Sequence, residues 1–150
     1  MRKLLFIILL TIVTACTQNN GFIGPWFGTW KLTEIRIDGV VDPDYQGNII
    51  WKFQSDIIEM VKADDIEHTA DSRWGTWVAN DDNTQITLNY THKAVVDGVE
   101  NTWTYTPLAE THLPRGVLIL DAEWGKNPKL LLTYLSEDGH VYTYSFKKWG

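Results

Sequence analysis

The stretch Trp26-Phe27-Gly28-Thr29-Trp30-Lys31-Leu32 is the first part of this chain with the pattern of a β-strand. A glycine at position 28 lets two backbones approach closely where the strand begins. The indole of Trp30, two residues further on, is large enough to plug one end of a closed sheet. After this stretch, strand-like segments follow one another, separated by turn residues. We therefore expect an all-β domain over residues 26–150, with Gly28 and Trp30 as the plug of one end.

Alternation of apolar and polar residues with a period of two indicates the individual strands. In the first strand the apolar parity switches near Thr33-Glu34, which predicts a β-bulge or a bend. Asp97-Gly98, flanked by valines, predicts a hairpin with a type I′ turn. Residues 64–73 are polar and predict a loop or a short helical turn. The side chains that we expect to face inward are Trp30, Trp51, Phe53, Met60, Leu88, Tyr90, Trp103, Tyr105, Leu118, Leu120, Leu132, Tyr134, Tyr142, Tyr144 and Phe146.

The strands number eight or nine, in meander order, and one apolar face must be covered. An antiparallel sheet of this size either curls into a barrel or splits into a sandwich. Hairpin connections favour an up-and-down β-barrel. A β-sandwich remains the alternative, because residues 38–48, 64–73 and 107–116 are long enough to form crossovers.

The N-terminus has the pattern of a secretory signal. A basic start, Met1-Arg2-Lys3, precedes an apolar run over residues 4–13 that is too short to cross a membrane. Val13-Thr14-Ala15-Cys16 follows, and it closely resembles the lipobox of bacterial lipoproteins. That resemblance implies a signal peptide over 1–15, cleavage before Cys16 and acyl chains on this cysteine. Residues 16–25 would then be a tether, and the localisation would be a membrane of the bacterial envelope, with the outer membrane favoured and the leaflet left open.

Charge and cysteine content restrict the partners. Cys16 is the only cysteine, so an internal disulfide cannot form. Loss of Arg2 and Lys3 would change the formal charge from −6 to −8, since 11 basic residues would remain against 19 acidic ones. This acidic balance argues against nucleic acid and against docking on anionic lipid headgroups. From net charge alone, the acyl anchor and not the protein surface is expected to contact the membrane.

Gly28-Thr29-Trp30 resembles the Gly-x-Trp motif that opens the first strand of lipocalins. Together with the lipobox, it makes the chain similar to small lipocalin-like lipoproteins of bacterial envelopes. The resemblance implies a barrel with a long loop after strand one, for which Val40 to Asn48 is suitably placed. It also implies a small apolar ligand at the open end of the barrel. The residues expected to bind this ligand are Trp51, Phe53, Tyr90, Trp103 and Tyr105.

Catalytic and metal-binding patterns are weak. Four scattered histidines lack the spacing of a metal pair on one strand. Asp121 and Glu123 share a strand face, and we interpret them as outward-facing polar residues. We expect no enzyme activity, no cofactor and no metal. Two other functions remain open: an envelope interaction module with a filled core, or a carbohydrate-binding sandwich in which aromatic side chains stack on sugars. The sequence leaves the oligomeric state open.

Overall fold

The computed structural model describes residues 24–64 and 69–149 of the chain. Its elements, in chain order, are β1 (Gly28–Ile37), β2 (Val40–Val41), β3 (Ile49–Gln54), β4 (Ile57–Asp64), β5 (Thr69–Ala79), β6 (Gln85–Tyr90), β7 (Ala94–Val96), β8 (Val99–Asn101), the 3-10 helices η1 (Trp103–Tyr105) and η2 (Ala109–Thr111), β9 (Gly116–Gly125), β10 (Lys129–Leu135) and β11 (Val141–Lys148). The predicted signal peptide, the predicted lipid-attachment residue Cys16 and most of the predicted tether lie outside the described residues. The described core runs from Trp26 to Phe146, within the predicted domain.

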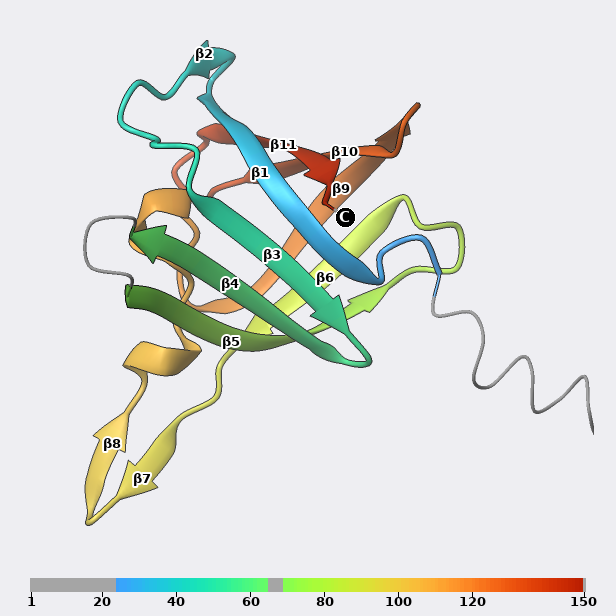
Figure 1. Ribbon diagram of the computed structural model, residues 1–150. Coiled ribbons are helices and arrows are strands. Elements are labelled where there is room, and N and C mark those ends of the chain that lie inside the picture. The colour runs from blue at the N-terminus through green and yellow to red at the C-terminus, as the bar shows by residue number, and fades with distance from the viewer. Residues whose placement is uncertain (1–23, 65–68, 150) are drawn as a thin grey trace, which may run out of the picture.

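The main sheet closes on itself to form a barrel (Figure 1). Its order is β11-β10-β9-β6-β5-β4-β3-β1-β2, and an additional pairing of β11 with β1 completes the circle. Apart from the two-residue β2, eight antiparallel strands follow one another around the barrel. This confirms the predicted lipocalin-like up-and-down barrel and excludes the sandwich. The long connections from β1 to β3 and from β6 to β9 each join strands that are neighbours in the closed sheet, so neither crosses from one sheet to another.

Strand β1 contains the predicted bulge. Its register against β11 shifts between Leu32 and Glu34, so that Trp30, Leu32 and Ile35 are all buried. The extra residue, Thr33, is exposed. The bulge allows one long strand to keep apolar residues inward although their parity changes.

The two ends of the barrel differ. We call the end at which β1 begins the Trp30 end and the opposite one the loop end. The segments before β3 and before β9 meet at the loop end, where His112 Nε2 lies 2.8 Å from Asp42 Oδ2. His140 Nδ1 lies 2.6 Å from Asp38 Oδ2 at the same end. The contact between His112 and Asp42 places the loop after β1 and the loop after Pro107 at the same end.

Strands β7 and β8 form a separate hairpin that projects from the barrel (Figure 1). Asp97 and Gly98 connect them with φ angles of 52° and 77°, as a type I′ turn requires. The predicted hairpin is therefore confirmed. It is an insertion between β6 and β9, and it takes no part in the barrel wall.

Two predictions of secondary structure were wrong. The ladder between β4 and β5 continues to the pair Asp64 and Thr69, so most of residues 64–73 are strand and not loop. Backbone hydrogen bonds between strands do not require apolar side chains, so the polar composition of this segment wrongly indicated a loop. Trp103 and Tyr105 belong to a 3-10 helix instead of an inward-facing strand. Around them, Asn101 Oδ1 accepts a hydrogen bond from the Trp103 N–H, and the Thr106 hydroxyl donates to the Thr102 carbonyl. Such local side-chain bonds compete with sheet formation.

Candidate ligand-binding site

The barrel interior is packed with aromatic side chains. Trp51, Phe53 and Tyr90, which were expected to bind a ligand, are each 0% exposed. The Trp51 ring lies 4.7 Å from the ring of Phe146 and 5.9 Å from that of Tyr144. Of the other residues expected to face inward, Tyr142 is only partly buried, and Trp103 and Tyr105 lie outside the barrel. The three interior residues thus fill the core.

The Trp30 end is closed by a cluster of indoles. Trp30 is fully buried, and its Nε1–H donates to the Trp26 carbonyl at 2.8 Å. The Trp26 and Trp124 indoles both hydrogen-bond to Asn83, at 2.9 and 2.8 Å. Gly28 has φ +116°, and a Cβ there would lie 2.8 Å from Nζ of a neighbouring lysine. The structure therefore places Gly28 and Trp30 at this end, together with two tryptophans that sequence reasoning missed.

The loop end is covered by the segment around η2. Leu108 and Leu113 insert into the core, and the Tyr144 hydroxyl donates to the Thr111 carbonyl at 2.5 Å. On the neighbouring strand β1, the Leu32 carbonyl accepts a hydrogen bond of 2.5 Å from the Tyr45 hydroxyl, and burial raises the pKa of Tyr45 to about 12. Both contacts fix connecting segments to the barrel wall. Together with Leu108 and Leu113, they cover the loop end of the core.

Three buried polar atoms lack a hydrogen-bond partner among the described residues. They are Trp51 Nε1, Trp77 Nε1 and the Tyr90 hydroxyl. An unsatisfied buried polar atom costs about 1–3 kcal/mol. A wholly apolar guest would leave all three atoms unsatisfied, so the interior chemistry does not match such a ligand.

An open pocket of about 380 Å³ lies on the outside of the barrel, next to Thr76, where the pairing between β5 and β6 ends. This volume is in the range of small-molecule sites, which begins at about 300 Å³. Apolar and aromatic groups make up most of its lining. The lining residues are Ile57, Trp74, Gly75, Thr76, His92, Thr104 and Tyr105. Of the five residues expected to bind a ligand, Tyr105 is the one that lies here.

Gly75 gives the inner side of this pocket its shape. A Cβ at this position would lie 2.9 Å from the Asn89 carbonyl oxygen and 2.9 Å from Cε1 of Tyr90. The Tyr90 ring therefore lies directly against the glycine backbone. Any side chain at position 75 would force β5 and β6 apart.

Two arginines hold the segment that carries Tyr105. Buried Arg73 on β5 binds Asp71 through two contacts of 2.8 and 3.1 Å, and it donates to the carbonyls of Trp103 and Thr106. Its guanidinium also lies 3.9 Å from the ring centroid of Trp103, which explains why that residue, 58% exposed, lies on the outside. A charged donor satisfied by several acceptors in a fixed planar geometry positions its neighbours well.

Arg115 fixes the other side of the same segment. Its guanidinium donates to the carbonyls of His92, Thr102 and Tyr105 at 3.1–3.2 Å. The rings of His92 and Tyr105 lie 5.8 Å apart and form one wall of the pocket. Sequence reasoning missed both arginines. Arg73 shares the strand parity of Gly75, and this parity is a signal of inward placement, but the polar residues around it obscured the strand.

The histidines and acidic residues show no catalytic arrangement. Among the described residues, no three His, Cys, Asp or Glu side chains are close enough to hold a metal ion. His112 and His140 pair with single aspartates at the loop end. Asp121 and Glu123 lie on the outer face of β9 and are exposed. His68 falls outside the described residues.

Comparisons with known proteins support the fold without assigning a function. No protein-family model matches the chain. No curated protein matches it at a significant level. Among solved structures, the crystal structure of an uncharacterized protein from Bacteroides eggerthii DSM 20697 is similar, with a TM-score of 0.57 and 19% identity over 83% of this chain and 99% of that one. Within residues 24–64 and 69–149, no helix combines the length and the apolar character that crossing a membrane requires.

Proposed function

We propose that this protein is a lipid-anchored, non-catalytic binding protein of the bacterial envelope that holds a small, mainly apolar molecule. The proposed site is the outer pocket beside Tyr105, not the barrel interior. The observation that supports it is the combination of an open, largely apolar pocket with a packed, capped interior. Trp74 and Tyr105 offer aromatic surfaces from two different elements, a strand and a 3-10 helix. Aromatic walls of this kind suit flat apolar or ring-containing ligands.

Binding can be measured with N-phenyl-1-naphthylamine, a dye that fluoresces in apolar sites, on the unacylated mature chain (residues 17–150). Tyr105→Ala removes one wall of the pocket, and Thr104→Trp fills it. We expect either change to weaken binding about tenfold or more, the equivalent of about 1.4 kcal/mol. Thr143→Trp, on the outer face of β11 and away from this pocket, is the matched control and should bind as the wild type does. Equal affinities for Thr104→Trp and Thr143→Trp would remove the site from the outer pocket.

Competition experiments would identify the ligand class. Fatty acids, retinoid-like molecules and oligosaccharides can each be tested for displacement of the dye. Displacement by fatty acids or retinoid-like molecules supports an apolar ligand. Displacement by oligosaccharides alone supports the carbohydrate alternative, now on a barrel instead of a sandwich.

The anchor is proposed from Val13-Thr14-Ala15-Cys16. Two acyl chains are what stable anchoring needs, because one holds only marginally. In cells, the wild type should enter the detergent phase of a Triton X-114 extract, and its N-terminal peptide should carry the acyl mass. Cys16→Ser should leave the protein uncleaved or in the aqueous phase, with an unchanged melting temperature of the domain. A Cys16→Ser protein that still enters the detergent phase would contradict the anchor.

A second function, an interaction module, is supported by the projecting hairpin. Val95, Val96 and Val99 are exposed on β7 and β8. Apolar side chains concentrated on one projecting arm are typical of contact surfaces. If the chain associates with itself in sedimentation velocity experiments, Val95→Thr with Val99→Thr should abolish this association while dye binding persists.

A further inference from the structure

The lysines of this acidic chain gather on one side of the barrel. We call Lys31, Lys52, Lys126, Lys129 and Lys147 the lysine face. Lys129 on β10 pairs with Lys147 on β11, and Lys147 pairs with Lys31 on β1. These three side chains therefore stand next to one another across three strands. Lys52 is diagonal to Lys31, because β3 pairs Lys52 with Thr29 and Ile50 with Lys31.

The lysine face differs from the other basic residues in its partners. In the part of the chain that the structure describes, none of its members lies within 4.0 Å of a carboxylate oxygen. Four other basic side chains pair with acids, in Arg36–Glu34, Lys62–Glu110, Arg73–Asp71 and Lys93–Glu100. Arg115 and Lys148 donate to backbone carbonyls instead. The nearest acids in register are Glu59, opposite Lys52, together with Glu123 and Glu34, which lie opposite Leu131 and Ser145 next to the row.

Adjacent like charges oppose folding. Like charges directly opposite each other on neighbouring strands destabilise a sheet. The row Lys129, Lys147 and Lys31 contains two such pairs and no acid between them. An external anion would relieve this repulsion, and the row therefore points to a negatively charged partner.

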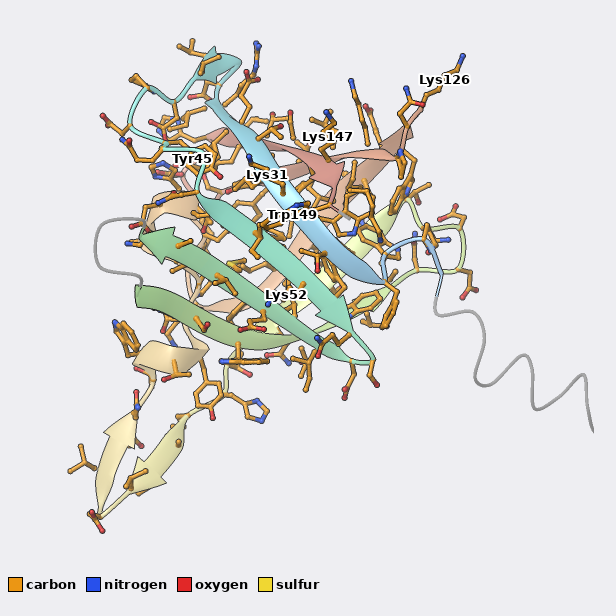
Figure 2. The ribbon with its side chains drawn as sticks, in the orientation of Figure 1. Lys31, Tyr45, Lys52, Lys126, Lys147 and Trp149 are labelled. Carbon is orange, nitrogen blue, oxygen red and sulfur yellow. The ribbon has the colours of Figure 1, made fainter. Side chains whose placement is uncertain are left out.

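Exposed aromatic side chains lie beside these lysines. Phe27 is 47% exposed and Trp149 is 57% exposed, both next to the ends of strands that carry the row. The Trp149 N–H donates to the Thr29 carbonyl at 2.9 Å, which places it two residues from Lys31. Figure 2 shows Lys31, Lys52, Lys147 and Trp149 over the side of the barrel formed by β1, β3 and β11. Tryptophan and lysine together are characteristic of surfaces that rest at a membrane–water interface.

The chain enters the barrel at the same end. Gly24, the first described residue, lies at the Trp30 end. A Cβ added to it would be 4.0 Å from Oδ1 of Asn83 and 4.0 Å from Cδ1 of Trp26. The segment between Cys16 and Gly24 spans at most about 30 Å when extended. An anchor on Cys16 would therefore hold the Trp30 end, and the lysines near it, close to the bilayer.

We propose that the lysine face docks on an anionic phospholipid surface and orients the barrel there. This inference rests on the proposed lipid anchor. Net charge alone argues against such docking, but the Debye length at physiological salt is about 8 Å. Exposed charges farther apart than this are largely screened, so distant acids count for less than charges at the contact. Glu34, Glu59 and Glu123 border the lysines and reduce the attraction, but the row Lys129, Lys147 and Lys31 has no acid within it. The lysines, which face the lipid directly, determine the interaction.

Vesicle co-sedimentation of the unacylated chain (residues 17–150) tests the docking apart from the anchor. The vesicles are phosphatidylcholine alone or with about one-third phosphatidylglycerol. Each lysine near an anionic surface contributes roughly a factor of five to binding. The triple variant Lys31→Gln, Lys129→Gln and Lys147→Gln should thus bind anionic vesicles on the order of 100-fold more weakly than the wild type.

The matched control removes the same charge from basic side chains that are already paired with acids. Arg36→Gln, Lys62→Gln and Lys93→Gln give the same net charge, and this variant should bind within about threefold of the wild type. Wild-type binding should also disappear at about 1 M salt, where the Debye length is about 3 Å. Equal losses in the two triple variants would show that net charge is responsible and would overturn the proposal. Equal wild-type binding to both kinds of vesicle, or binding to a soluble polyanion such as heparin but to no vesicle, would also overturn it.

The anchor and the docking can fail separately. The vesicle assay uses no acyl chain, so its result does not depend on Cys16. The Triton X-114 experiment with Cys16→Ser, in turn, does not depend on the lysines. A Cys16→Ser protein that still enters the detergent phase would contradict the anchor alone, and equal losses of vesicle binding in the two triple variants would contradict the docking alone.

Discussion

Replacing Trp30 with alanine would test whether the stability of the barrel depends on the indole that closes the Trp30 end. The side chain is 0% exposed, and its Nε1–H donates to the Trp26 carbonyl at 2.8 Å. Its ring lies 5.8 Å from that of Trp124, and the Lys148 ammonium lies 4.6 Å from its centroid. Alanine would remove the ring, its donor and the surface on which this ammonium rests.

The expected loss is large compared with the stability of a domain of this size. Truncating a buried aromatic residue to alanine costs about 3–5 kcal/mol. Losing the hydrogen bond of Trp26 adds about 1 kcal/mol. The total of about 4–6 kcal/mol is a large part of the 5–15 kcal/mol typical of a folded domain. Each kcal/mol corresponds to about 3–4 °C in melting temperature here, so we expect a decrease of about 15–20 °C.

Thermal unfolding of the unacylated chain, followed by circular dichroism, provides the measurement. Trp149→Ala is the matched control, because this tryptophan is exposed at the same end and its hydrogen bond is made by the backbone. We expect a shift of less than about 3 °C for this control. Trp30→Phe keeps most of the ring and should lose about 5 °C. Equal shifts for Trp30→Ala and Trp149→Ala would refute the role of Trp30 in closing the barrel.

Two further predictions concern a close contact and a pair of titrating groups. Gly75→Ala should destabilise the barrel by about 1–3 kcal/mol, because its Cβ would overlap the Tyr90 ring, whereas Gly125→Ala should be nearly neutral; equal melting temperatures for the two variants would contradict this. The hydrogen bond to the Asp38 carboxylate raises the pKa of His140 above 6.5, while a backbone N–H of β11 and this histidine lower the pKa of Asp38 below 3.8. The contribution of His140 to the free energy of unfolding is complete below pH 6.5 and is lost as pH rises through its raised pKa. The contribution of Asp38 is complete above pH 3.8 and is lost as pH falls through its lowered pKa. The stability difference between wild type and His140→Ala, from urea unfolding at several pH values, should therefore be widest between pH 3.8 and 6.5, and a difference independent of pH would disprove the linkage.

The sequence by itself was sufficient to favour the barrel over the sandwich and to predict several details of the fold. Alternation with a period of two is a local property, so strands such as Ile49–Gln54 can be recognised without knowing their partners. The parity switch near Thr33 predicted the bulge for the same reason. Asp97-Gly98 predicted its turn because the two residues tolerate the positive φ angles that they adopt.

Local patterns failed where side chains competed with the sheet. Trp103 and Tyr105 alternate with threonines as strand residues do, yet hydrogen bonds from neighbouring polar side chains form a 3-10 helix there. The position of Arg73 inside the wall depends on the β4–β5 register, which polar residues concealed. The outer pocket depends on both of these features, so sequence reasoning placed the ligand in the interior instead.

The lysine face was determined by tertiary structure alone. Lys31 and Lys147 are 116 positions apart in the sequence, and they become neighbours only because β11 pairs with β1 when the barrel closes. In the composition, acidic residues outnumber basic ones, so the composition alone does not reveal that these lysines are neighbours. Electrostatic interactions depend on the distances between charges, and the register of a closing strand pair sets these distances in three dimensions.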